Sequence, residues 1–120
     1  MTPSAKSVFY FGIYITLAGL SLLFFPNFLL SVIGLENTNE VWIRFAGILL
    51  TELSVYYIIA AKKQLFTIFR VTVFTRCTII ILFSALVYLE MMKPVMLAFG
   101  AIDFAGGVWT YLAMKKERIW

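Results

Sequence analysis

Histidine is absent from this sequence of 120 residues, and cysteine occurs once, as Cys77. Without histidine there is no imidazole ligand for haem, no histidine acid–base chemistry and few of the ligand sets that zinc uses. A single cysteine excludes an intramolecular disulfide, and a thiol within an apolar run behaves as a small hydrophobic side chain. We therefore expect no cofactor and no metal site.

Charged residues are also scarce, at 13%, whereas 62% of the residues are hydrophobic. Soluble domains carry roughly 25% charged and about 45–50% apolar residues. A chain this short cannot hide so much apolar surface inside a soluble globule, so we expect membrane lipids to surround most of it. The net charge is +4. The basic residues lie at the ends of apolar runs, not in a stripe with aromatic residues, so no nucleic-acid partner is expected.

The residues that common catalytic sites need are missing as well. Serine and cysteine have no histidine to activate them, and neither a glycine-rich phosphate loop nor a metal-ligand cluster is present. Two carboxylates within apolar runs permit acid–base chemistry on a lipophilic substrate, but no motif indicates it. A non-enzymatic protein is the favoured interpretation.

Four apolar runs are each long enough to cross a membrane, which takes about 20 residues. They cover residues 7–25, 41–61, 65–89 and 95–114. The first run is long for a signal peptide, and no small-residue cleavage site follows it. The pattern predicts an all-α integral membrane four-helix bundle that forms a single domain over residues 1–120.

The charges flanking the runs predict how the chain is oriented. One side of the membrane would hold the basic residues Lys6, Lys62, Lys63, Lys115, Lys116 and Arg118. The opposite loops hold Glu36, Glu40, Glu90 and only one basic residue, Lys93. Because cytoplasmic loops are enriched in lysine and arginine, we expect both termini to be cytoplasmic.

The first connection is longer than the other two, and it contains a further apolar stretch. Asn27 is expected to cap a short helix over residues 28–33, and Gly34 to end it. Such a helix would lie in the outer membrane interface or fold over the mouth of the bundle.

Small residues recur at helical spacing in three of the spans, and small residues allow helices to pack closely in lipid. The three sets are Gly12, Thr16 and Gly19; Gly47, Thr51 and Ser54; and Gly100, Asp103, Gly107 and Thr110. They predict helix–helix contacts, and they are also compatible with the wall of a narrow cavity.

Three charged residues fall near the middle of the membrane. Glu52 precedes Lys62 by ten residues, or about 15 Å, and Asp103 precedes Lys115 by twelve, or about 18 Å. Arg76 follows Lys63 at a similar depth. Each charge costs at least about 2.5–3.5 kcal/mol at that depth, so all three should face inward and meet.

Three interpretations of this charged set stay open. Arg76 can bridge both carboxylates in a network that fixes helix register. Alternatively Glu52, Arg76 and Asp103, with Tyr56 one turn from Glu52, form the polar floor of a ligand pocket. In the third, the excess negative charge is balanced by a proton, an ion or a cationic ligand, and the protein couples ion movement to transport.

Short motifs are spread over nearly the whole chain. They are Pro26 with Gly34-Leu35, Trp42-Ile43-Arg44 with Gly47, Tyr56-Tyr57 with Ala60-Ala61, Arg70, Arg76, and Phe99-Gly100 with Asp103 and Trp109-Thr110. This pattern resembles small bacterial four-helix membrane proteins of the DoxX-like group. The resemblance implies a bundle in the bacterial inner membrane, and some members of the group are described as quinone-linked respiratory subunits.

The layout is also similar to sterol-isomerase and sigma-2-type bundles, although those isomerases rely on histidine, which this chain lacks. It differs from small multidrug transporters, whose essential glutamate is in the first helix; the first span here is uncharged. The leading hypothesis is a membrane protein that binds a lipophilic or amphiphilic small molecule through Glu52, Tyr56, Arg76 and Asp103. The alternatives are a small transporter coupled to protons or cations, acting as a homo-oligomer, and an accessory subunit of a larger membrane complex.

Overall fold

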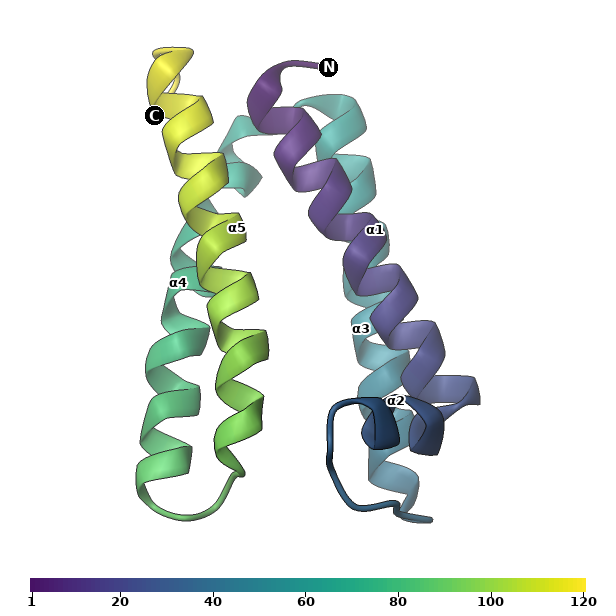
Figure 1. Ribbon diagram of the computed structural model, residues 1–120. Helices are drawn as coiled ribbons and strands as arrows, with labels where there is room; N and C mark the ends of the chain where they lie inside the picture. Colours follow the sequence, from purple (N-terminus) through teal and green to yellow (C-terminus); the bar gives the residue numbers. More distant parts are fainter. The chain divides into compact units, whose positions relative to one another are not determined.

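The protein is helical throughout, and its structure, a computed structural model, describes residues 1–120. The helices are α1 (Pro3–Phe24), α2 (Pro26–Val32), α3 (Val41–Lys63), α4 (Phe66–Tyr88), the short 3-10 helix η1 (Pro94–Met96) and α5 (Leu97–Lys116) (Figure 1). Helices hold 82% of the residues and no strand is present, which confirms the all-α class.

Four helical segments have the length and composition of membrane spans, namely α1, α3, α4 and the continuous segment Pro94–Lys116 formed by η1 and α5. Each is 22 or 23 residues long, and at most 33% of the most apolar part of any of them is buried within the protein. Large apolar side chains such as Leu17, Phe74 and Tyr88 are exposed. In a membrane, lipid tails would surround these side chains, so the fold is that of a multi-pass membrane protein.

The first span begins earlier than its predicted start at residue 7. Helix α1 starts at Pro3, and the Ala5 amide donates to Thr2 Oγ1 over 3.2 Å. Thr2 thus caps the helix, and proline is favoured at the first helical position because its missing N–H would be unpaired there. Lys6 therefore lies within α1, not before it.

The predicted short helix after the first span exists as α2, but its predicted cap is wrong. The residue before the helix is Phe25, no side chain caps it, and Pro26 occupies the first turn. Asn27 lies inside the helix, where its Oδ1 accepts a hydrogen bond from the Thr38 amide over 2.8 Å. Gly34 ends the segment as predicted, with φ of 82°.

The residues group into two compact units. Unit 1 comprises Met1–Val8 and Ala60–Trp120, and unit 2 comprises Phe9–Ile59. The single domain over 1–120 stays a prediction, and each unit is described by itself.

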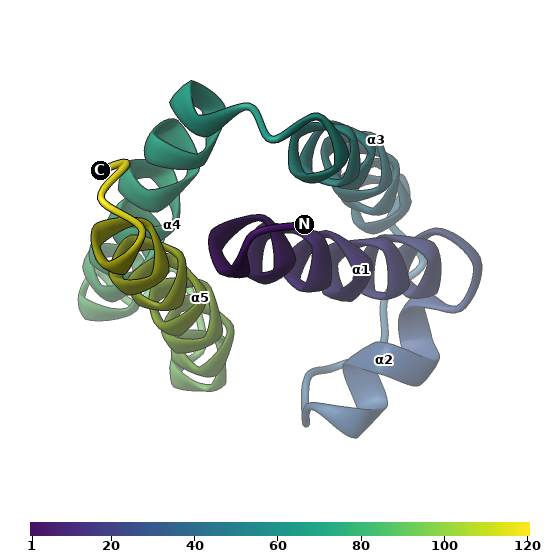
Figure 2. The same cartoon turned by 90° about the horizontal axis from the view of Figure 1, so that it is seen from above.

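In unit 2, α1 and α3 lie side by side in both views (Figures 1 and 2). Glycines allow their backbones to touch: a Cβ added to Gly47 would lie 2.6 Å from the Leu23 amide nitrogen and 2.7 Å from the Gly19 carbonyl oxygen. A Cβ at Gly19 would lie equally close to Thr51. The predicted small-residue contact between these spans is confirmed.

In unit 1, α4 and α5 run antiparallel beside each other, joined by a short loop (Figure 1). Gly107 lies against the side chains of Cys77 and Arg76, and Gly100 lies against those of Ile80 and Phe83. These glycines bring α5 close to α4 at the level of Arg76, so the predicted contact is confirmed for this pair too.

Four helices end in the same way. After α3, the residue Gln64 has φ of 52°, its amide donates to Ala61 O, and the next amide, of Leu65, donates back to Ala60 O. The same pair of bonds closes α2 at Gly34, α4 at Glu90 and α5 at Arg118. This is the Schellman ending, which normally uses glycine, yet three of the four positions carry other residues.

Candidate functional site

The four residues predicted to bind a ligand are divided between the units. Arg76 on α4 and Asp103 on α5 belong to unit 1, and Glu52 and Tyr56 on α3 belong to unit 2. Glu52 and Tyr56 are exposed, one helical turn apart. The neighbouring Tyr57 is buried and meets the ring of Phe11 edge-on.

Arg76 is the largest fully buried side chain of the protein, with 2% of its surface exposed. Its Nε donates to the Thr72 carbonyl oxygen over 3.2 Å, and its Nη2 donates to Thr72 Oγ1 over 3.0 Å. Nη2 also donates to Thr110 Oγ1 on α5 over 2.9 Å. These acceptors are neutral, so they hold the guanidinium in place without cancelling its charge.

The hydroxyl protons around Arg76 can be assigned in one direction. Ser7 Oγ donates to the Ser4 carbonyl oxygen over 2.6 Å, which uses its only proton. Ser7 and Thr110 hydroxyls are 2.7 Å apart, so Thr110 must donate to Ser7. Because guanidinium can only donate, Thr110 accepts from Arg76. Thr110 therefore turns its oxygen toward the cation and its proton toward Ser7, which is the orientation that stabilises a buried positive charge.

A second group of hydrogen bonds joins the start of α1 to the residue after α5. The amide of Ser4 donates to Glu117 Oε1 over 2.9 Å, and Ser4 Oγ donates to Glu117 Oε2 over 2.7 Å. The positive end of the α1 helix dipole also stabilises a carboxylate at this position. Glu117 thereby ties the first turn of α1 to the end of α5, and that turn supplies the Ser7 hydroxyl to Thr110.

Asp103 is half-buried on α5, and the charge of Arg76 is close enough to act on its carboxylate. Two of the four predicted residues thus belong to unit 1 and interact electrostatically. The pair combines a hydrogen-bond donor, the guanidinium, with an acceptor, the carboxylate. They are two charged groups inside otherwise apolar helices.

Sequence reasoning missed Ser4, Ser7 and Thr72 and treated Thr110 only as a packing residue. Their hydroxyl-bearing side chains are all buried. The spacing of these residues was a signal. Ser4 and Ser7 are three residues apart and Thr72 and Arg76 are four apart, so each pair lies on one face of its helix. The prediction began the first span at residue 7 and so left Ser4 outside it.

Two exposed arginines, Arg44 and Arg70, each donate to a backbone carbonyl near the end of a helix. Arg44 Nη1 donates to the carbonyl oxygen of Leu23 at the end of α1, and Arg70 Nη2 donates to that of Ile119 beyond α5. Each bond joins neighbouring segments of one unit.

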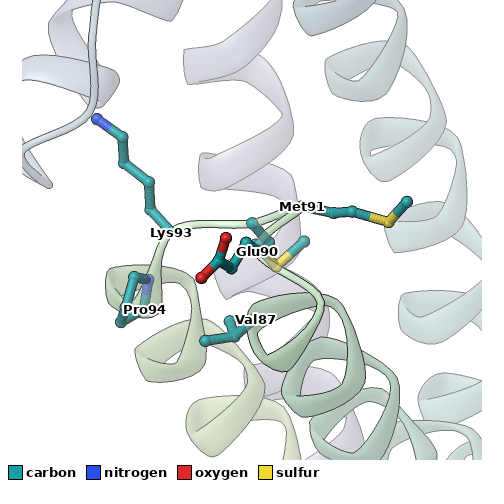
Figure 3. A pocket seen from close by; sticks show the side chains of 6 residues that line it. Val87, Glu90, Met91, Lys93 and Pro94 are labelled. Atoms are coloured by element: carbon teal, nitrogen blue, oxygen red, sulfur yellow. The ribbon is translucent and has the colours of Figure 1, made fainter.

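An open hollow of about 450 Å³ lies at the loop between α4 and η1, away from Arg76. It is lined by Val87, Glu90, Met91, Met92, Lys93 and Pro94. Figure 3 shows Lys93 and Met91 extending away from each other instead of converging on a common point. The hollow therefore lacks the convergent polar groups that a ligand site needs.

Comparison with known proteins gives no relative. No protein-family model, no curated protein and no solved structure matches this chain. The resemblance to DoxX-like proteins therefore stays a prediction, and function is inferred from the site itself.

Proposed function

We propose that the protein binds a lipophilic or amphiphilic small molecule within the membrane, with Arg76 and Asp103 as its polar contacts. The observation that carries the proposal is the buried Arg76 guanidinium, held by the neutral hydroxyls of Thr72 and Thr110. A charge within a membrane span costs at least about 2.5–3.5 kcal/mol, and such residues usually mark binding or transport sites.

The ligand class follows from the surroundings of this pair. Apolar side chains dominate the helices on either side, so the bulk of the ligand is apolar. Its polar group meets a donor and an acceptor at one depth. Glu52 and Tyr56 remain the sequence-based candidates for additional contacts.

The test is native mass spectrometry of the wild-type protein extracted with its own lipids. The expected result is one additional mass at fixed stoichiometry, which Asp103→Asn removes because amide nitrogen replaces an acceptor oxygen. Glu90→Gln is the matched control, since it makes the same chemical change in an exposed residue outside the spans. A wild-type chain without additional mass, or a mass retained by Asp103→Asn, would overturn the proposal; Glu52→Gln reports separately on the predicted contact.

The cellular setting is part of the same proposal. We place the protein in the bacterial inner membrane with both termini cytoplasmic and α2 in the outer interface. Supporting this, the hydrogen bonds between Ser4 and Glu117 hold the first and last turns of the spans together at one end of unit 1. Phe28 and Val32 leave an exposed apolar surface on α2, as an interfacial helix requires.

A further inference from the structure

The end of unit 1 at which α5 finishes collects most of the positive charge of the protein. Hydrogen bonds bring the start of α1 and the start of α4 to this end, through Ser4 with Glu117 and Arg70 with Ile119. Seven of the ten basic residues lie there and are exposed, namely Lys6, Lys62, Lys63, Arg70, Lys115, Lys116 and Arg118. We call these seven residues the basic end.

Glu117 carries the one acidic side chain at the basic end. Its two carboxylate oxygens already accept hydrogen bonds from Ser4, so they are occupied within the fold. The basic side chains are therefore left to interact with an external anion.

The segment after α5 folds back as a hook, which we define as residues 117–120. Arg118 takes φ of 61°, which reverses the chain direction. The Trp120 ring then packs edge-on against Tyr111 on α5, with centroids 4.7 Å apart. It also contacts Phe74 on α4, where the ring planes are tilted by 42° and the centroids are 5.8 Å apart. Arg70 donates to Ile119 within the hook.

The hook gathers cations and an aromatic ring at one place. The Lys115 ammonium lies 5.8 Å from the centre of the Tyr111 ring, the same ring that Trp120 contacts. Arg70 uses one N–H on Ile119, and a guanidinium has five donors in a planar fork that suits phosphate oxygens. Tryptophan prefers the depth of lipid headgroups, where one side is apolar and the other wet.

From this arrangement we propose that the hook and its neighbours form a specific site for an anionic phospholipid headgroup, with Arg70, Lys115 and Arg118 contacting the phosphate. The site adjoins the ends of the membrane spans, which is the level at which headgroups lie. The fixed hook distinguishes it from general attraction between lysines and a charged leaflet. The proposal is independent of the ligand proposed for Arg76 and Asp103.

The test uses native mass spectrometry of the protein in micelles containing equal amounts of phosphatidylglycerol and phosphatidylcholine. Wild type is expected to retain phosphatidylglycerol preferentially at one molecule per chain. The triple variant Arg70→Gln, Lys115→Gln and Arg118→Gln should lose this preference, by more than the factor of about fivefold per charge that general attraction to an anionic leaflet gives. The matched control is Lys62→Gln with Lys63→Gln, which removes charge from the same end but outside the hook.

Several results would overturn the proposal. Equal retention of the two lipids by wild type would show no headgroup selectivity. Equal losses per charge removed in the triple variant and in the control would show diffuse attraction only. Displacement by millimolar inorganic phosphate would identify a free-anion site instead. If the triple variant fails to fold, a variant with Trp42→Phe and Trp109→Phe leaves Trp120 as the fluorophore. Brominated phosphatidylglycerol should then quench the Trp120 fluorescence more than brominated phosphatidylcholine does. Equal quenching by the two lipids would contradict the site.

The two proposals fail separately. Hook variants leave Arg76 and Asp103 in place and should keep the small-molecule mass, whereas Asp103→Asn should keep the preference for phosphatidylglycerol.

Discussion

At the scale of single residues, Thr110 occupies the centre of the buried hydrogen-bond chain. Its hydroxyl accepts from Arg76 and donates to Ser7, and none of its surface is exposed. Hydrogen bonds between membrane helices average about 0.6 kcal/mol, but leaving a buried donor without its partner costs about 1–3 kcal/mol, more for a charged group. Thr110 thus contributes to stability mainly because its removal would leave Arg76 and Ser7 with unpaired buried groups.

Thr110→Val keeps the shape of the side chain and removes the hydroxyl. We expect it to lower the free energy of unfolding by about 1–3 kcal/mol, because it leaves Arg76 and Ser7 each lacking one buried bond. Thermal unfolding in mild detergent, followed by circular dichroism, measures the change. Thr78→Val is the control: Thr78 is exposed and donates to Phe74 O in its own helix, so its effect should stay within about 0.5 kcal/mol. Equal effects of the two would contradict the assigned chain.

At the scale of helices, the glycines of the two packed pairs are not equivalent. A Cβ at Gly47 would meet the backbone of α1 at 2.6 Å, and backbone cannot move aside without separating the helices. A Cβ at Gly107 would meet Cys77 Sγ at 3.2 Å, a side chain that can shift slightly.

We therefore expect Gly47→Ala to destabilise unit 2 by about 1–3 kcal/mol through overpacking. Gly107→Ala should be close to neutral, because alanine gains about 1 kcal/mol of helix propensity over glycine and offsets a small clash. Thermal unfolding of the two variants side by side gives the comparison. A larger loss for Gly107→Ala than for Gly47→Ala would contradict the α1–α3 contact described above.

The helix endings offer a gain in stability. Gln64 has a left-handed backbone, which costs a residue with a side chain roughly 1–2 kcal/mol and costs glycine nothing comparable. Gln64→Gly should raise the free energy of unfolding by up to about 1 kcal/mol. Lys63→Gly, one residue earlier and within α3, should lower it by about as much, since glycine is unfavourable inside a helix. Melting temperatures that shift in the same direction for both variants would refute this account of the ending.

At the scale of the whole molecule, the exposed apolar surface requires a lipid environment, and the distribution of basic residues predicts the orientation of the chain in the membrane. In a Cys77→Ala background, Asn39→Cys should react with a membrane-impermeant maleimide in intact spheroplasts. The reason is that the lysine-rich loop after α3 and both termini are expected in the cytoplasm, which places the loop before α3 outside. Lys116→Cys should react only after lysis. The opposite labelling pattern would show that both termini are outside.

Much of the fold could be predicted from the sequence because its signals are local. Long apolar runs bounded by charges define spans, and the observed helices agree with the predicted ones to within about four residues at each edge. Gly34 marked a helix end because glycine adopts the left-handed conformation readily. Gln64, Glu90 and Arg118 adopt it as well, and they were missed because their residue types do not favour it.

The sequence by itself determined the helical class and the four apolar spans, and it predicted that Glu52, Arg76 and Asp103 lie at one depth. Only the tertiary structure decided which residues of other helices hold Arg76, because its acceptor Thr110 is 34 residues away in the sequence. Ser7, which accepts from Thr110, is separated from it by 103 residues. The physical reason is that hydroxyls in helices have a local alternative. Thr16, Ser21 and Thr78 each donate to a carbonyl of their own helix, four residues back. Sequence cannot tell such a hydroxyl from one like Thr110 that reaches across, since packing alone selects between the two.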